Sequence, residues 1–180
     1  MIRSLSRAVM IAVSSALSLG MISGVANADG KVTWQNNATG HYLEVYHSST
    51  AEGAGVDTWT WNGSDTQYWY DTKLSNGYWL EENWNSGLLM TAYNTCSQGI
   101  TQWGLGTLPD GWTTQQWKEF HHGTGVWELI NHAGCDGNPY QDTLAEAQGN
   151  SVYIYTEGDA SAPATCYTYS DTPIVPCTWN

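Results

Sequence analysis

The stretch 43–69 combines carboxylate and aromatic residues at a spacing that could bind or transform a ligand. Within it, residues 56–61 read VDTWTW. Side chains alternate between the two faces of a strand, so if Val56 faces a core, Asp57 and Trp59 face away from it together. A carboxylate then lies beside an aromatic plate. This pair fits part of an enzyme site, a strand unit of a larger core or a sugar pocket, and recurrence of the unit separates these interpretations.

Familiar catalytic motifs are missing from the sequence. It contains no Gly-x-Ser-x-Gly, no glycine-rich phosphate loop, no His-Glu-x-x-His and no EF-hand pattern. The adjacent pairs Glu81-Glu82 and His121-His122 do not form two-residue sites, because neighbours on a strand point to opposite faces. We therefore expect no catalytic residue, cofactor or metal. A glycoside hydrolase stays open as a less favoured alternative, since two distant carboxylates among 17 acidic residues could meet.

The first 28 residues have the pattern of a secretory signal. Arg3 and Arg7 precede an interrupted apolar run, and Ala26-Asn27-Ala28 has the small-x-small form that signal peptidase cuts. The run is short for a membrane anchor, and no later segment could cross a bilayer. The sequence thus predicts a signal peptide over 1–28 and a secreted, extracellular domain over 29–180, whose length suits one core.

The charge of the 29–180 segment excludes several partner classes. Three lysines stand against all 17 acidic residues, which gives a net charge of −14. Nucleic acid and anionic membranes require clustered Lys and Arg, so we expect neither as a partner. A neutral partner is compatible with this charge.

Four cysteines lie in the same segment, and an even number in an exported chain indicates two disulfides. Their spacing contains no Cys-x-x-Cys, which argues against a zinc site. Four cysteines allow three pairings. We favour Cys166 with Cys177, which closes a short loop near the C-terminus, and Cys96 with Cys135.

Aromatic residues and turn formers indicate an all-β fold. All 11 Trp and all 11 Tyr fall within 29–180, with abundant Gly, Asn, Thr and Ser between short patterned runs. No stretch shows convincing apolar recurrence at helical spacing. Period-two patterns predict strands at HYLEV (41–45), VDTWTW (56–61), QYWYD (67–71), GYWLEE (77–82), QQWKEFH (115–121), VWELIN (126–131) and VYIYTE (152–157).

The unit recurs along the chain. Gln67-x-Trp69 is followed 48 residues later by Gln115-x-Trp117. Each is preceded by a short predicted strand, VDTWTW (56–61) or ITQWGL (100–105), with Trp59 and Trp103 in matching places. A third copy is indicated by VYIYTEG (152–158), although there TCYTY (165–169) takes the expected place of Gln-x-Trp. Three Gly-rich, four-stranded units, at roughly 32–83, 84–131 and 132–180, fill the segment, and a closed threefold β architecture follows.

With its two Gln-x-Trp motifs in register, the chain resembles the ricin-type β-trefoil lectins. The family's repeats carry a Leu-Asp-Val-like strand, a Gly-containing loop and a Gln-x-Trp. The resemblance implies a β-trefoil of three four-stranded repeats with pseudo-threefold symmetry and a secreted module that binds neutral saccharides or polysaccharide weakly. Trp69 and Trp117 are expected in the structural core, where an indole fills space and Gln holds nearby backbone or a carboxylate.

The resemblance places a sugar pocket in the first repeat. Glu44 stands where the family has an Asp that accepts hydrogen bonds from sugar hydroxyls, and Asp57 occupies a polar position. Trp59 stands at the position of the aromatic platform. Thr66 replaces a usual Asn, and Gln67 corresponds to the Gln that orients the acid. Carboxylates accept hydrogen bonds from vicinal hydroxyls and an indole stacks on the apolar face of a pyranose. Glu is longer than Asp, and Thr lacks the amide donor of Asn. The family's in-repeat cysteines are replaced by Tyr42 and Trp61.

The other two repeats match this pattern less well. In the second, Met90 or Thr91 stands where the acid should be. In the third, Asp142, Tyr153 and Tyr155 could form a pocket. An alternative function is a non-lectin trefoil, a secreted interaction or inhibitor module, with its contacts on loop 104–114 and Trp112. The sequence leaves the sugar and the oligomeric state open.

Overall fold

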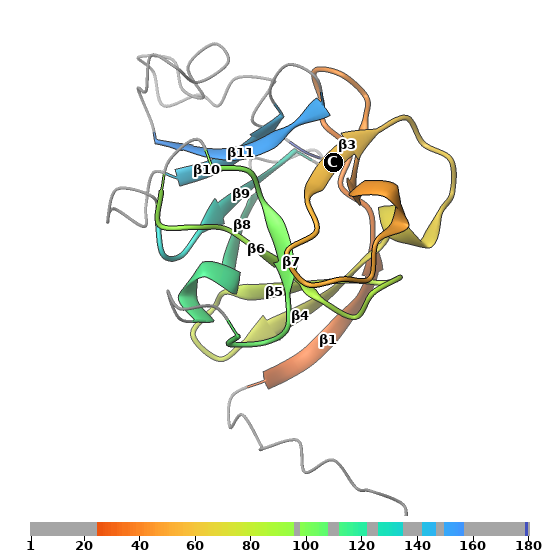
Figure 1. Ribbon diagram of the computed structural model, residues 1–180. Coiled ribbons are helices and arrows are strands. Elements are labelled where there is room, and N and C mark those ends of the chain that lie inside the picture. Colours follow the sequence, from red (N-terminus) through yellow and green to blue (C-terminus); the bar gives the residue numbers. More distant parts are fainter. Residues whose placement is uncertain are drawn as a thin grey trace, which may run out of the picture.

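The computed structural model describes residues 25–95, 98–107, 112–121, 126–134, 142–146, 150–156 and 179, and it shows an all-β fold around a closed core (Figure 1). The described strands are β1 (Val25–Val32), β2 (Tyr42–Val45), β3 (Val56–Trp59), β4 (Trp69–Leu74), β5 (Trp79–Asn83), β6 (Leu89–Thr91), β7 (Thr101–Trp103), β8 (Trp117–His121), β9 (Trp127–Asn131), β10 (Asp142–Glu146) and β11 (Val152–Thr156). The 3-10 helices within the described residues are η1 (Tyr46–Ser48), η2 (Asp65–Gln67) and η3 (Trp112–Gln115).

The strands fall into three successive units that meet at a pseudo-threefold axis. The first unit is β1–β4, the second is β5–β8, and the third is β9–β11 with Trp179. At the axis the three units bond to one another through backbone: Val56 N–H donates to Ile100 O (2.8 Å) and Ile100 N–H donates to Val152 O (3.1 Å). An antiparallel bridge between Asp57 and Ser151 joins the third unit to the first. The predicted β-trefoil is therefore confirmed, including the match of Val152 to Val56.

Each unit contributes one tryptophan to the same layer of the core. Trp69, Trp117 and Trp179 are all fully buried. Each indole Nε1–H donates to a backbone carbonyl of its own unit: Trp69 to Leu43 O at 3.1 Å, Trp117 to Met90 O at 3.0 Å and Trp179 to Leu144 O at 3.1 Å. The first two were predicted core residues.

The third tryptophan corrects the sequence analysis. Trp179, and not TCYTY (165–169), takes the place of Trp69 in the third unit. It follows Val152 by 27 residues, whereas Trp69 follows Val56 by 13. This longer connection is why the sequence alignment of the third repeat missed Trp179. Cys177 precedes it at the position where the other repeats have Gln.

Most predicted strands are present with shifted ends. The alternation in β3 is as expected, because Val56 and Thr58 are buried while Asp57 is partly exposed and Trp59 is exposed. Gln67 and Gln115 were expected within strands, but each ends a 3-10 helix just before its strand. These tight turns aim the Gln side chain back at the preceding loop, as described below. Three strands, β1, β6 and β10, were not predicted.

Strand β1 begins ahead of the expected cleavage site after Ala28. It pairs with β4, from Val25 opposite Leu74 to Val32 opposite Trp69. Cleavage after Ala28 would leave the pairs from Gly30 to Val32 in place. Among the described residues, no helix has the length and apolar character needed to cross a membrane.

Candidate functional site

Strands β2 and β3 hold two carboxylates opposite each other. The antiparallel register pairs Glu44 with Asp57 and, two positions away, Tyr42 with Trp59. Paired residues on neighbouring strands project from the same face, so the register brings the acids and the indole to one side of this two-stranded sheet. The inner face of the same strands carries Leu43, Val45 and Val56 into the core. The alternation that builds the core thus also assembles the site.

A 3-10 turn closes one side of this site. Directly after β2 the chain enters η1, where His47 (φ 53°) and Ser48 (φ 54°) adopt left-handed backbone conformations. This conformation is uncommon for residues other than Gly and turns the chain sharply. Tyr46 and His47 stack on each other with ring centroids 3.8 Å apart.

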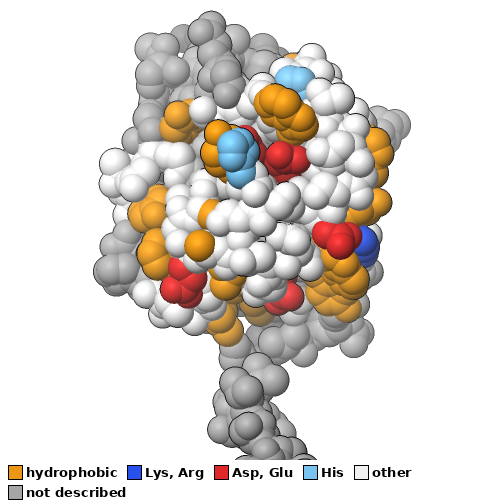
Figure 2. All heavy atoms as spheres, turned by 45° about the vertical axis from the view of Figure 1, so that its right-hand side comes forward, with side chains coloured by type: hydrophobic (Ala, Val, Ile, Leu, Met, Phe, Trp, Pro, Cys, Tyr) orange, Lys and Arg blue, Asp and Glu red, His pale blue; other side chains and the backbone are white. Residues whose placement is uncertain are grey.

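Together these segments enclose a pocket of about 170 Å³. Four of the five residues predicted for the sugar site line it, namely Glu44, Asp57, Trp59 and Thr66. The other lining residues were not predicted: Tyr46, His47, Ser48, Asn62 and Ser64. Figure 2, turned so that the side carrying the first unit comes forward, shows acidic side chains in a hollow between hydrophobic and histidine side chains.

Gln67 lies behind the pocket rather than in its lining. The residue is fully buried, its Nε2 donates to Thr60 O at 3.1 Å, and its Oε1 accepts the Asn62 N–H at 2.9 Å. Gln115 in the second unit does the same, since its Nε2 donates to Gly104 O at 2.9 Å and its Oε1 accepts Gly106 N–H at 2.8 Å. The Gln side chain therefore fixes the loop that forms one rim of the pocket.

That loop supplies an amide donor that Thr66 lacks. Thr66 is buried, and its hydroxyl donates to Ser64 Oγ at 2.9 Å, so it packs at the pocket floor. Asn62, which also lines the pocket, accepts Ser64 N–H through Oδ1 at 2.8 Å. This bond orients the Asn62 side chain and leaves its Nδ2 amide as a donor. The Asn62-Gly63 pair, which is typical of a turn, is the sequence signal that could have indicated this rim.

The two carboxylates are electrostatically coupled. Burial, and then the neighbouring charge of Glu44, raise the pKa of Asp57 to about 7. Burial also raises the pKa of Glu44, while a hydrogen bond from Gln67 and the charge of His47 lower it in part. Glu44 Oε2 and Asp57 Oδ1 are each buried without a hydrogen-bond partner. Near neutral pH Asp57 is therefore about half protonated, and the pair has two unused polar atoms that could accept hydrogen bonds from vicinal hydroxyls.

Trp59 forms the outer edge of the pocket. Its side chain is 52% exposed, which leaves the indole available for stacking. Beside it, Tyr42 and Trp61 contact each other with ring centroids 4.6 Å apart. These two residues stand where the resemblance places the family's in-repeat cysteines, so an aromatic contact replaces that link.

The equivalent positions of the second unit carry no acid. The register of β6 and β7 pairs Thr91 with Thr101 and Leu89 with Trp103, matching Glu44 with Asp57 and Tyr42 with Trp59. Thr91, not Met90, therefore takes the acid position. Trp103 is half buried, and a Cβ on Gly53 would lie 3.3 Å from its ring.

The third unit departs from the prediction in a similar way. In β10 and β11, Ala145 pairs with Tyr153 and Thr143 with Tyr155. Tyr153 thus corresponds to Asp57, and Ala145 to Glu44. Asp142 pairs with Thr156 and lies three residues before the acid position, so it does not replace the acid.

Other predicted features fall outside the described residues. These are all four cysteines with their proposed pairing, most of the tip of loop 104–114, and the side chains of Trp112, Asp142 and Tyr155.

A second carboxylate cluster lies inside the barrel. Asp71 of β4, Glu81 of β5 and Glu119 of β8 each place a carboxylate oxygen within 4.8 Å of the others. Glu81 is fully buried and accepts the Trp34 indole N–H through Oε2 at 3.0 Å. Such oxygens could ligate a hard cation or share a proton. Burial, and then the charges of Asp71 and Glu119, raise the pKa of Glu81 well above its ordinary value, which favours the shared proton.

Comparison with known proteins agrees with the trefoil fold. The family model described as ricin-type beta-trefoil lectin domain-like matches residues 21–103, which span the first unit and the pocket. The resemblance to the ricin-type β-trefoil lectins is confirmed. Among curated protein sequences, none matches the chain.

Solved structures share the trefoil fold at low identity. The designed threefold-symmetric protein ThreeFoil is 24% identical with a TM-score of 0.63, over 84% of this chain and 97% of that one. The Rhizoctonia solani agglutinin is 16% identical with a TM-score of 0.60, over 86% and 94%. An exo-β-1,3-galactanase from Clostridium thermocellum is 18% identical with a TM-score of 0.65, but this trefoil covers only 30% of that chain. At these identities the likeness shows the fold alone.

Proposed function

We propose that this protein is a secreted carbohydrate-binding module that holds a neutral saccharide in the pocket of its first repeat. The observation that carries the proposal is the pair of partly buried carboxylates, Glu44 and Asp57, with unsatisfied oxygens beside the exposed face of Trp59. Carboxylate oxygens accept hydrogen bonds from vicinal hydroxyls, and an indole stacks on the apolar face of a sugar ring. The strongly acidic chain disfavours anionic glycans, which supports a neutral ligand.

Affinity for a single sugar should be weak. The pocket is small and offers one stacking plate with a few hydrogen bonds, which corresponds to a Kd of roughly 1 mM, or about −4 kcal/mol. Retention on a polymer would then depend on several copies of the module bound near one another. Export through residues 1–28 would place the module where extracellular polysaccharides occur.

The decisive experiment compares Trp59→Ala with its threefold-equivalent, Trp103→Ala, on a glycan array and by titration calorimetry. Trp59→Ala should abolish binding and leave the melting temperature nearly unchanged, because the side chain is half exposed. Trp103→Ala should bind as the parent does. A Trp59→Ala protein that stays folded and binds every glycan like the parent would exclude this pocket.

One observation favours a second function, glycoside hydrolysis. Two facing carboxylates, one with its pKa raised to about 7, are also the groups that an acid and a base of a glycosidase require. Release of reducing sugar from a bound polysaccharide, lost in Asp57→Asn, would establish it. Binding without release supports the lectin-like module.

A further inference from the structure

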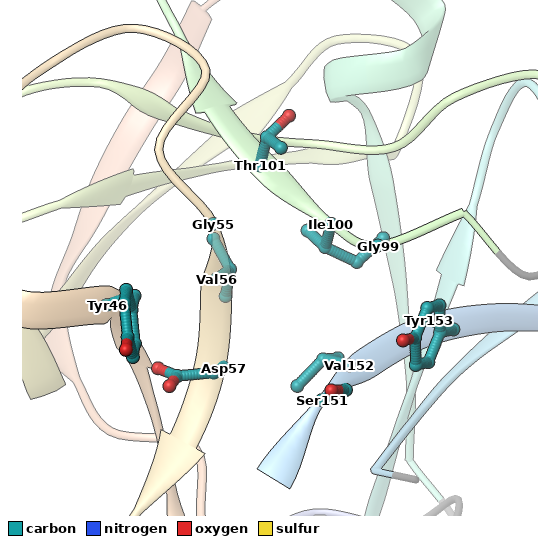
Figure 3. Close-up of a pocket in the computed structure, with 10 residues that line it drawn as sticks. All are labelled: Tyr46, Gly55, Val56, Asp57, Gly99, Ile100, Thr101, Ser151, Val152 and Tyr153. Carbon is teal, nitrogen blue, oxygen red and sulfur yellow. The ribbon is translucent and has the colours of Figure 1, made fainter. Parts of the chain in front are cut away.

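A second hollow opens next to the sugar pocket, at the point where the three units meet on the pseudo-threefold axis. Its volume is about 330 Å³, at the lower end of the range for small-molecule sites. We call it the axial cup. Each unit supplies three consecutive residues to it, which begin at Gly55, Gly99 and Ser151. Figure 3 shows these three segments around a common open space.

The axial cup has an apolar floor and a polar rim. The central residues of the three segments, Val56, Ile100 and Val152, are almost fully buried and belong to the core. The residues that follow them in the second and third units, Thr101 and Tyr153, are partly exposed and line the cup. An apolar base with hydroxyl and aromatic groups around it matches a sugar ring, whose faces are apolar and whose edge carries hydroxyls.

Small residues keep the cup open. A Cβ added at Gly55 would meet no heavy atom within 4 Å, and one added at Gly99 would lie 3.9 Å from the Tyr153 ring. Neither Gly has a positive φ, so backbone conformation alone does not require Gly at these places. The absence of side chains there provides space.

The cup and the sugar pocket share a wall. Tyr46 and Asp57 line both hollows. In Figure 3 the Asp57 carboxylate points toward Tyr46, across from the segment that carries Tyr153. Asp57 Oδ1 has no hydrogen-bond partner, so this carboxylate can accept a hydrogen bond from a hydroxyl of a ligand that extends between the two hollows.

We propose that the axial cup is a second saccharide subsite, continuous with the Trp59 pocket, and that the ligand class is a neutral oligosaccharide of at least two rings. One ring stacks on Trp59, the next lies in the cup against Tyr153, and Asp57 binds hydroxyls near the linkage. This inference rests on the proposed function, because it extends the same site. With this subsite, the module recognises a segment of a saccharide chain rather than one terminal sugar.

The test uses three pairs of probes on the parent chain: glucose with cellobiose, galactose with galactobiose, and mannose with mannobiose. For the pair that binds, the disaccharide should bind about tenfold more tightly than its monosaccharide. In NMR titrations the amide signals of Gly99 and Ser151, which line the cup alone, should shift with the disaccharide but not with the monosaccharide.

A filling variant supplies the control. Gly55→Leu should reduce disaccharide affinity to that of the monosaccharide and leave monosaccharide affinity unchanged, whereas Trp59→Ala should abolish both. Equal affinities for mono- and disaccharide, or unshifted Gly99 and Ser151 signals with the disaccharide, would refute the subsite while the Trp59 pocket stands. Failure of every probe to bind the folded parent would refute the proposed function as well. The NMR measurement holds even if Gly55→Leu does not fold.

Discussion

The carboxylate of Glu81 should make the trefoil less stable as pH rises, and Glu81→Gln should remove that loss. Strand register shows why the position is unusual. Each core tryptophan pairs with a residue on a neighbouring strand: Trp69 with Val32, Trp117 with Trp79 and Trp179 with Trp127. The residues two positions after these partners are therefore threefold equivalents, namely Trp34, Glu81 and Leu129. A carboxyl therefore stands in a core layer where the other units have apolar side chains.

The sign of the effect follows from the direction of the pKa shift. Glu81 has a raised pKa, because burial and the neighbouring charges of Asp71 and Glu119 disfavour its ionised form. The folded state then holds a proton that the unfolded state releases above about pH 4.5. The stability contributed by Glu81 is complete below that pH and falls as pH rises toward the folded pKa. Within this window the loss is about 1.4 kcal/mol per pH unit for one proton.

Glu81→Gln is the matched variant because it keeps both shape and hydrogen bonding. The amide oxygen can accept the Trp34 indole N–H, now 3.0 Å from Glu81 Oε2, and the amide nitrogen can donate to Asp71 and Glu119. Leu would instead leave the Trp34 donor unsatisfied, which costs roughly 1–3 kcal/mol. The Gln variant should equal the parent near pH 4.5 and exceed its stability at pH 7.

The assay is urea unfolding of both proteins at each half unit from pH 4.5 to 8, in the presence of EDTA. The difference in unfolding free energy between them should grow with pH. A constant difference across the range would refute the protonated state of Glu81. In a second series of measurements, Ca²⁺ replaces EDTA. If Ca²⁺ raises the melting temperature of the parent at pH 8 but not that of Glu81→Gln, the cluster holds a cation in place of a proton.

Three further predictions concern the core and the pocket. Trp179→Ala should destabilise the domain by roughly 3–5 kcal/mol, like truncation of other large buried aromatics, and a melting temperature near that of the parent would contradict its place in the core. Saccharide affinity should rise from pH 5.5 to 8, because hydroxyl donors favour the ionised form of Asp57, whose pKa is about 7; calorimetry on Asp57→Asn should show a flat profile, and a parent that is equally flat would exclude this acid from binding. Finally, Thr91→Glu combined with Thr101→Asp should create a second pocket beside Trp103, raising the calorimetric stoichiometry from one to two, and an unchanged stoichiometry in the folded variant would show that the acids are not sufficient.

The first repeat was readable from sequence because its residues obey simple local rules. Alternation in VDTWTW separated Val56 from Asp57 and Trp59, and the Gln-x-Trp spacing located two core tryptophans. The third core tryptophan was missed because Trp179 lacks the Gln and follows a longer connection. Once the partner motif changes, length alone cannot fix the register of a strand.

Two other features had no local signal. The pocket wall at Tyr46–Ser48 depends on left-handed backbone conformations at His47 and Ser48. In a sequence, these residue types do not usually indicate such a turn. In the sequence, Glu81 is one of two adjacent acids with nothing to distinguish it from Glu82. The prediction that these neighbours face opposite ways is confirmed, since Glu81 is buried and Glu82 exposed, but only the closed barrel shows which of them faces inward.

Core and site follow different degrees of symmetry in this molecule. The indole-to-carbonyl bonds of the three core tryptophans repeat in all three units, because each unit must fill the same layer. The acid position does not repeat: it holds Glu44, then Thr91, then Ala145. Packing constrains the inner face of each strand, while the outer face can vary without cost to the fold. The pairing of Glu44 with Asp57 therefore cannot be attributed to the demands of the trefoil itself. This difference between the faces is the physical reason for proposing that the first repeat binds saccharide.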